Sequence, residues 1–294
     1  MRPVAVADRV LPMNYRHAFH AGNFADVLKH VVLVALIEAQ QRKPAPFCYV
    51  ETHAGRGRYD LGSAQALRSR EYADGVQRVF DAAEGPHALQ RYVELVRGVN
   101  PGTAGKLVVY PGSPLLASLL MRDHDRAVLC ELQDQEAAAL RALFRNDQRI
   151  AVHRRDGYAA LNALLPPNPR RGLVLIDPAF EAQETEFERI DAALDCALKR
   201  WPSGVYAIWY PIKLRRTLAS FHRRLAQRGH RTEVLLAELM VRPATSALRL
   251  NGAGVAIINP PWQLAHEIAR LLPALLRMLD QGGGTHSVTH PGSS

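Results

Sequence analysis

The sequence is poor in cysteine and has no long hydrophobic run, and each absence narrows the class of protein. Its three cysteines, Cys48, Cys130 and Cys196, are odd in number and widely spaced, which argues for a reducing compartment and against a zinc site. The longest apolar run, Val31 to Ile37, is far too short to span a bilayer. The start of the chain has no apolar segment of the kind found in cleavable signals. We therefore expect a cytoplasmic protein that binds neither metal nor membrane.

Lysine is also scarce, but basic residues are not. Lysine and arginine total 37 and aspartate and glutamate total 28, so the net charge is 37 − 28 = +9, with a pI near 9.8. Such an excess favours a polyanionic partner, nucleic acid before all others. The basic residues form small clusters, and each cluster alone can be a solvated face. Together they favour phosphate contact: Arg154-Arg155, Arg170-Arg171, Lys213 with Arg215-Arg216, and Arg223-Arg224.

The pattern of apolar segments predicts an α/β protein. A chain of 294 residues with 48% hydrophobic and 22% charged residues has room for one large domain with an inserted subdomain. Seven segments are expected to be strands of one mixed, Rossmann-like sheet, the last two as an antiparallel pair. They are Phe47–Glu51, Ala127–Glu131, Ile150–His153, Gly172–Ile176, Gly204–Tyr210, Glu233–Val241 and Gly254–Ile258.

The organisation of the chain outside these strands is less regular. Residues 1–13 are expected to be a flexible leader and 14–280 the folded domain. Residues 61–110 are mostly polar with a helical pattern, which predicts a helical insert within that domain. Residues 281–294 are rich in glycine, serine, threonine and histidine, and we expect them to be disordered.

The most informative stretch is GLVLIDPAF, from Gly172 to Phe180. Its apolar run, closed by Asp-Pro, predicts a strand buried on both faces, with Asp177 at the carboxyl end where α/β sheets hold ligands. Pro178 turns the backbone out of the sheet. A carboxylate, a stiff turn and the ring of Phe180 suit a flat, amino-bearing ligand such as adenine. Alternatively, Asp177 caps the next helix and Phe180 fills the core.

Two further turns follow predicted strands. The first strand runs into THAGRGRYD, where Gly55 and Gly57 let the backbone pass close to a ligand and His53 can reach a cofactor carboxylate. A Pro-Gly-Ser-Pro turn places Ser113 as the cap of a helix that begins with Pro114. The amides at such a helix start also suit a carboxylate ligand.

Two acids end the second and third predicted strands. Glu131 is at the position where nucleotide-binding α/β folds bind ribose hydroxyls, although it can equally cap a helix or face solvent. Asp156, followed by Gly157, can receive an adenine amino group or simply cap the following helix.

The stretch YRHAFHAGNFADVLKH, residues 15–30, precedes a helix with a strongly apolar pattern. The helix starts at Asn23 or at Ala25-Asp26. A single histidine on such a helix is usually structural, but this stretch brings one tyrosine and three histidines together: Tyr15, His17, His20 and His30.

A second motif competes with the Asp-Pro turn. Asn259-Pro260-Pro261-Trp262 is closer in letters to the (Asp/Asn)-Pro-Pro-aromatic motif of amino methyltransferases. It follows the seventh strand rather than the fourth and opens the last helix. We therefore expect it to be a stiff structural turn with a packed tryptophan.

The order of these strands and turns is similar to that of a class I S-adenosylmethionine-dependent methyltransferase. Seven stretches resemble the RlmJ family of bacterial 23S rRNA adenine-N6 methyltransferases: YRHAFHAGNFADVLKH, ETHAGRGRY, YPGSP, DG, LIDPAF, YAIWYP and INPPW. The resemblance covers residues from 14 to the end of the last helix, and the first two stretches are the most specific.

The resemblance implies a role for each candidate site residue. The cofactor, S-adenosylmethionine, would be held at its methionine end by His30, His53 and Ser113, at its ribose by Glu131, at its adenine by Asp156 and Gly157, and beside its methyl group by Asp177. The catalytic group would be Asp177. The target adenosine would lie among Tyr15, His17, Lys29, Pro178 and Phe180.

The chain departs from the family at the catalytic turn, where DPPY is usual and DPAF is present. The carbonyl of Pro178 and the stacking face of Phe180 remain, whereas Ala179 gives a looser turn that puts the rate in doubt more than the reaction type. The resemblance implies N6-methylation of an adenine in unfolded or protein-free 23S rRNA by a monomer. Two alternatives remain: a catalytically silent RNA-binding protein of the same fold, and a DNA adenine-N6 methyltransferase.

Overall fold

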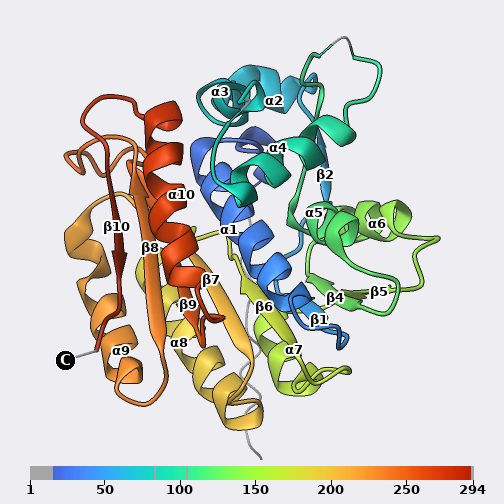
Figure 1. Cartoon of the computed structure of the whole chain (residues 1–294), viewed down its shortest axis with the longest axis vertical. Helices are drawn as coiled ribbons and strands as arrows, with labels where there is room; N and C mark the ends of the chain where they lie inside the picture. Colours follow the sequence, from blue (N-terminus) through green and yellow to red (C-terminus); the bar gives the residue numbers. More distant parts are fainter. Residues whose placement is uncertain (1–15, 83, 104, 293–294) are drawn as a thin grey trace, which may run out of the picture.

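A computed structural model of the chain describes residues 16–82, 84–103 and 105–292; Tyr15 and the leader lie outside this part. An eight-stranded sheet forms its centre (Figure 1). In spatial order the strands are β10 (Thr285–Thr289), β8 (Val234–Met240), β9 (Gly252–Ile258), β7 (Val205–Ile212), β6 (Gly172–Ile176), β1 (Cys48–Glu51), β4 (Arg126–Glu131) and β5 (Ile150–Arg154). All seven strands expected from the sequence are confirmed, with small differences at their ends.

The parallel part of the sheet contains a point where the strand order reverses. Strand β1 pairs in parallel with β4 on one side and β6 on the other. From β1 the chain moves outward to β4 and β5, then returns to place β6 and β7 on the opposite side. The carboxyl ends of β1 and β6 therefore flank a topological switch point, where open α/β sheets bind ligands.

Helices cover both faces of this sheet. The α-helices are α1 (Phe24–Gln41), α2 (Ala64–Ser69), α3 (Val76–Phe80), α4 (His87–Gly98), α5 (Ser113–Leu120), α6 (Asp134–Leu143), α7 (Gly157–Leu164), α8 (Gln183–Arg200), α9 (Ala219–Gly229) and α10 (Leu264–Leu279). Short 3-10 helices are η1 (His17–Phe19), η2 (Glu71–Asp74) and η3 (Arg215–Leu218). Alternate strand residues face opposite sides, so two cores form. One core packs beneath α1, α4, α5 and α10, and the other beneath α7, α8 and α9.

Helix α1 is buried along almost its whole length. It lies between the sheet and the helices of residues 64–98, and it also contacts α5 and α10 (Figure 1). Asn23 caps it, with its side-chain oxygen accepting from the amides of Ala25 and Asp26. A helix buried on all sides has few positions for charged groups, so Asp26 and Lys29 within it need local partners.

The range expected to be a helical insert contains α2, η2, α3 and α4. A two-stranded ribbon, β2 (Arg58–Asp60) with β3 (Val109–Pro111), connects its two ends. The insert docks on the start of α1, where the Val76 amide donates to the Gly22 carbonyl at 2.7 Å. Gly75 allows this approach, because a Cβ there would lie 2.1 Å from the same oxygen. The insert thus fixes the segment that enters α1.

The expectation of disorder from residue 281 onward is wrong for Thr285–Thr289. This segment forms β10, which pairs antiparallel with β8 and adds the eighth strand to the sheet. An edge strand exposes one side and needs no continuous apolar run, so its polar composition concealed it. Its side chains still make specific contacts: Val288 packs against the core, and the Ser287 hydroxyl donates to Glu238 at 3.3 Å.

Glu238 is a buried acid that connects the strands at this edge, and its removal should destabilise the fold. Its carboxylate accepts from the hydroxyl of Tyr210 at 3.0 Å and from Arg215 at 2.9 Å, as well as from Ser287. We expect Glu238→Ala to lower the free energy of unfolding by about 2 to 4 kcal/mol, because it leaves the buried Tyr210 hydroxyl unpaired and removes the partner of Arg215. Urea denaturation measures this. Glu233→Ala, at an exposed neighbouring acid, is the control; equal losses in the two variants would contradict the assigned role.

Candidate active site

A cavity of about 640 Å³ lies at the carboxyl ends of the parallel strands, over the switch point. Within the described part of the chain, every residue proposed from the sequence lines this cavity. From the N-terminal segment and α1 come His17, Lys29 and His30; from the strand ends and their turns come His53, Ser113, Glu131, Asp156, Gly157, Asp177, Pro178 and Phe180. Segments distant in sequence therefore form one wall.

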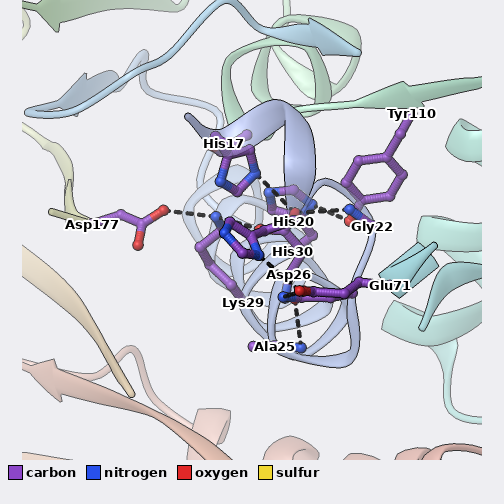
Figure 2. Close-up of polar contacts among 12 residues, drawn as sticks. His17, His20, Gly22, Ala25, Asp26, Lys29, His30, Glu71, Tyr110 and Asp177 are labelled. Atoms are coloured by element: carbon purple, nitrogen blue, oxygen red, sulfur yellow. Dashed lines mark hydrogen bonds and ion pairs between the residues drawn. The ribbon is translucent and has the colours of Figure 1, made fainter. Parts of the chain in front are cut away.

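The centre of the site is an ion pair between the sheet and α1. Lys29 Nζ lies 2.6 Å from Asp177 Oδ2 and 2.8 Å from Asp26 Oδ1, so one ammonium joins two carboxylates (Figure 2). Lys29 is 5% exposed and Asp26 4%, whereas Asp177 is 15% exposed and borders the cavity. The arrangement fixes the direction of the Asp177 carboxylate, because Lys29 of α1 binds its Oδ2.

The electrostatics of this group keep Lys29 charged. Burial alone would lower the pKa of its ammonium, but the nearby Asp177 and Asp26 carboxylates outweigh that effect and raise the pKa above its ordinary value. Burial would likewise raise the pKa of Asp26, yet His17 and Lys29 hold it well below its usual range. Lys29 and Asp26 are thus both ionised throughout the physiological range.

Asp26 is a residue that the sequence analysis did not select. Its second oxygen accepts from His17 Nε2 at 2.9 Å and from the Gly22 amide at 2.9 Å (Figure 2). Asp26 therefore joins the N-terminal turn to Lys29. A signal was available, because an acid three residues before a lysine inside an otherwise apolar helix indicates a buried pair.

The Asp-Pro turn takes a strained conformation. Phe180 has φ +50°, in the left-handed region that bulky side chains rarely adopt, at a cost of about 1 to 3 kcal/mol. Its ring borders the cavity and also packs edge-on against Phe187 and Trp209. Phe180 therefore fills the core, as one interpretation predicted, and its contact with a ligand stays a prediction. Asp177, in contrast, is not a helix cap, because α8 begins after Ala182 without a side-chain cap.

His30 presents a polar atom to the cavity wall. Its Nδ1 lies 2.7 Å from the Tyr110 hydroxyl, and its Nε2 has no hydrogen-bond partner among the described residues although it is buried. Burial, together with the Lys29 charge, lowers the pKa of His30 well below its ordinary value, so the ring is neutral. If Tyr110 donates to Nδ1, Nε2 carries the proton and can donate to a ligand oxygen.

Ser113 does not cap α5, contrary to the sequence-based expectation. Gly112 occupies the cap position, and the Ser113 hydroxyl donates instead to Glu51 Oε1 at 2.5 Å. Glu51, the acid at the end of β1, also accepts from the Tyr49 hydroxyl at 2.8 Å and is fully buried. A buried carboxyl group needs such partners, and this need outweighs the capping preference. No local pattern indicates that Glu51 bonds Ser113.

The state of Glu51 should make stability depend on pH. Burial raises the pKa of Glu51 to about 8, although the bonds from Ser113 and Tyr49 act in the opposite direction. The folded protein holds this proton while the unfolded chain releases it near the ordinary value of 4.5, so Glu51 makes stability fall as pH rises from 4.5 to 8.

Glu51→Gln is expected to remove this decline, because the amide is neutral at every pH. The stability of the variant relative to the original protein should therefore rise by a few kcal/mol between pH 5 and pH 8.5. Urea denaturation at the two pH values checks this. A difference between the two proteins that stays constant with pH would show that Glu51 ionises normally.

Glu131 is already oriented by the backbone. Its two carboxylate oxygens accept from the amides of Gly55 at 2.8 Å and Gln133 at 2.7 Å. Burial raises the pKa of Glu131, and these amide bonds oppose the rise. The neighbouring His53 donates to or accepts from Thr52 at 2.8 Å, and burial lowers its pKa to about 4. The turn after β1 thus presents a neutral imidazole to the cavity and, through the Gly55 amide, fixes the Glu131 carboxylate at the end of β4.

Asp156 does cap its helix, the plainer of the two readings of this residue. Its Oδ1 accepts from the Ala159 amide at 2.8 Å, and its Oδ2 lies 3.2 Å from Arg189. It also borders the cavity, so a second role is compatible with the cap. The adjacent Gly157 is required by space, because a Cβ there would lie 2.0 Å from the Thr52 carbonyl oxygen.

The competing Asn-Pro-Pro-Trp motif lies beside the amino ends of the parallel strands, away from the cavity. Strand β9 runs antiparallel to β7 and pairs Ile258 with Tyr206, so Asn259 follows beside the start of β7. Asn259 bonds the carbonyls of Pro202 and Gly204 at 2.7 and 2.8 Å, which is a structural role. The expectation of a packed Trp262 is wrong, since its side chain is 80% exposed.

Two negative observations apply to the part of the chain that the structure describes. No three histidine, cysteine, aspartate or glutamate side chains gather there as a metal ion would require. None of the helices in residues 16–82, 84–103 and 105–292 has both the length and the apolar character needed to cross a bilayer.

The fold and the cavity together define a class I methyltransferase. Five parallel strands are followed by a reversed strand beside β7, and the polar wall lies at the switch point. The family model described as Ribosomal RNA large subunit methyltransferase D, RlmJ, matches residues 44–290. The chain belongs to the RlmJ family of ribosomal RNA large subunit methyltransferases.

Individual relatives agree with this assignment over nearly the full chain. Proteins named Ribosomal RNA large subunit methyltransferase J from Escherichia coli (strain K12) and Haemophilus influenzae are 41% and 39% identical; each match covers 94% of this chain, and 97% and 98% of the respective relative. A crystal structure of a protein from Legionella pneumophila, 34% identical, superposes with a TM-score of 0.85 and covers 93% of this chain and 99% of that one.

Proposed function

We propose that this methyltransferase transfers a methyl group from S-adenosylmethionine to N6 of an adenine in 23S ribosomal RNA, acting on unfolded or protein-free RNA. The observation that carries the proposal is the Asp177 carboxylate, held by Lys29 at 2.6 Å beside the Pro178 turn on the cavity wall. Ribosomal RNA is the substrate named for the relatives, and a net charge of +9 suits a polyanion.

The cavity residues fit the cofactor. His30 Nε2 is a buried polar atom without a partner among the described residues, as a site for the cofactor carboxylate would leave it. Glu131, fixed by two amides, retains acceptor capacity for ribose hydroxyls. His53 and Ser113 border the same space, and Asp156 with Gly157 would meet the adenine ring. The bound cofactor supplies a methyl group activated by its sulfonium.

The target amine needs orientation more than it needs a base. The adenine N6 lone pair is delocalised into the ring, so the amine is a weak nucleophile. Asp177 Oδ2 is held by Lys29, which leaves Oδ1 to accept one N6 hydrogen, and the Pro178 carbonyl accepts the other. These two acceptors favour a pyramidal nitrogen directed at the methyl group, so alignment supplies much of the rate. The excess proton leaves only after N6 has become cationic and acidic.

The proposal also gives roles to three further residues. Phe180 offers its ring face to the adenine, and His17 borders the cavity on the side of α1. Tyr15, outside the described residues, is proposed to lie against the adenosine. We propose that the enzyme acts as a monomer, in the cytoplasm with its RNA.

Methyl transfer from labelled S-adenosylmethionine tests the proposal. Protein-free 23S rRNA, assembled large subunits and duplex DNA are offered separately, and the modified nucleoside is identified by mass spectrometry. We expect N6-methyladenosine in the protein-free rRNA. Label in duplex DNA would indicate a DNA methyltransferase, and cofactor binding without transfer to any nucleic acid would indicate a silent RNA-binding protein.

A further inference from the structure

One part of the cavity rim has no role in the chemistry described above. It is the connection between β8 and β9, residues 241–251. Strand β8 is antiparallel to β9, and β9 is antiparallel to β7, so β8 ends at the same edge of the sheet as β7 and β6. Three residues of this connection, Leu248, Arg249 and Leu250, line the cavity that also holds Asp177.

Leu248 is exposed at this rim to an unusual degree. Its side chain is 97% exposed, whereas the neighbouring Leu250 packs partly against the core. An isolated leucine on the surface is ordinary, but one at the mouth of a substrate cavity can contact whatever enters. A protein-docking site would instead show a contiguous apolar patch, and the residue beside Leu248 is an arginine.

The connection holds Leu248 in place rather than leaving it loose. The buried side chain of Asn251 donates to the carbonyls of Lys213 at 2.6 Å and Ser246 at 2.7 Å. The amide of Leu248 donates to the Ser246 hydroxyl at 3.3 Å. Through Asn251 the loop is bonded to the end of β7, so Leu248 has a defined position relative to the catalytic turn.

Basic groups surround this leucine. Arg249 and Lys213 line the cavity and are exposed, and Arg242 stands at the start of the same connection. Burial and the charge of Arg249 lower the pKa of Arg242, whereas the charge of Asp74 raises it. Arg249 and Lys213, both exposed on the cavity wall, can bind phosphates, so the rim suits a nucleic acid backbone.

We propose that Leu248 is a wedge that enters the RNA base stack when the target adenosine leaves it, while Arg249 and Lys213 bind the flanking phosphates. The inference rests on the proposed function and extends it from the reaction to the way the base is extracted. Extracting a stacked base costs a few kcal/mol, and apolar side chains that fill the gap offset part of that cost. Leu248 is thus a positioning residue, and its effect should depend on whether the adenine is paired.

The test compares two forms of one substrate. The methylated adenine is first located in protein-free 23S rRNA with the original protein. Hairpins carrying that adenine are then made with uridine opposite it, or with an abasic site opposite it. We expect Leu248→Ala to lower kcat/KM about tenfold or more on the paired hairpin and less than about threefold on the other. Leu248→Met should retain activity on both.

Trp262→Ala is the matched control, because Trp262 is another exposed large side chain but lies at the opposite edge of the sheet. It should leave both substrates unaffected. Calorimetry with S-adenosylmethionine and thermal unfolding should give the same values for all variants, since Leu248 packs against nothing that stabilises the fold.

Each other outcome is informative. Equal losses on the two hairpins, or no loss on either, would overturn the wedge while leaving the proposed function intact. A loss seen only on ribosomal particles would show that Leu248 docks on a protein instead. If the original protein methylates no RNA at all, the proposed function fails and the wedge fails with it.

Discussion

Asp177→Asn is expected to lower kcat for methyl transfer at least about a thousandfold while changing the affinity for S-adenosylmethionine less than about threefold. The amide has almost the same shape, so it occupies the same space at the end of β6. It replaces an acceptor with either a donor or a weaker, neutral acceptor. N6 then loses one of the two acceptors that align it, and the charge that stabilises the cationic amine also disappears.

Single-turnover methylation of protein-free rRNA and calorimetry with the cofactor measure the two quantities separately. Asp123→Asn, at an exposed acid outside the cavity, is the control for the substitution itself. Retained activity in Asp177→Asn would remove this carboxylate from the reaction. A large loss of cofactor affinity would instead assign Asp177 to binding rather than to the chemical step.

The second large effect is expected from Lys29→Met, which should destabilise the fold by about 3 to 5 kcal/mol and also abolish most activity. Methionine fills the volume but removes the cation from between Asp26 and Asp177, which are 2.8 and 2.6 Å from Lys29 Nζ. The buried Asp26 then keeps only His17 as a charge-compensating partner. Because the pKa of Lys29 is raised above its ordinary value, the group is charged throughout neutral pH, and the stability loss should be constant from pH 6 to pH 9.

Urea denaturation and methyl transfer are measured on the same preparations. Adding Asp26→Asn to Lys29→Met should recover part of the stability, because it removes the orphaned charge, but it should not recover activity. Lys43→Met, at an exposed lysine after α1, provides the control. If Lys29→Met proved as stable as the original protein, the pair would not be carrying a buried charge.

The positions of the seven strands along the chain were predictable, because each strand is marked by a pattern within its own few residues. Buried parallel strands are short apolar runs, and three of those in this sheet, β1, β4 and β6, are closed by an acid, as in Gly172–Asp177. The tail was misjudged because β10 is held by partners distant in sequence, such as Glu238, and not by its own apolar content. Edge strands of this kind leave little pattern in the sequence.

The cavity residues could be selected from motifs, but their mutual contacts could not. Ser113 reads locally as a cap and in the structure bonds Glu51, 62 residues away. The pairing of Lys29 with Asp177 spans 148 residues and depends on how α1 docks on the sheet. Such contacts are set by the packing of elements, so a single sequence names the participants without stating which of them touch.

The helical insert has a consequence for how the family can vary. The insert bonds Gly22 through the Val76 amide, Gly22 bonds Asp26, and Asp26 bonds Lys29. Lys29 in turn bonds Asp177, so a change in how these helices pack would be transmitted to the reacting carboxylate through four hydrogen bonds. Residue 75, where no side chain fits, should tolerate substitution in the family far less than the exposed Gly98 at the end of α4, where a Cβ would meet open space. The helical insert, although peripheral, is thereby constrained in sequence together with the catalytic turn.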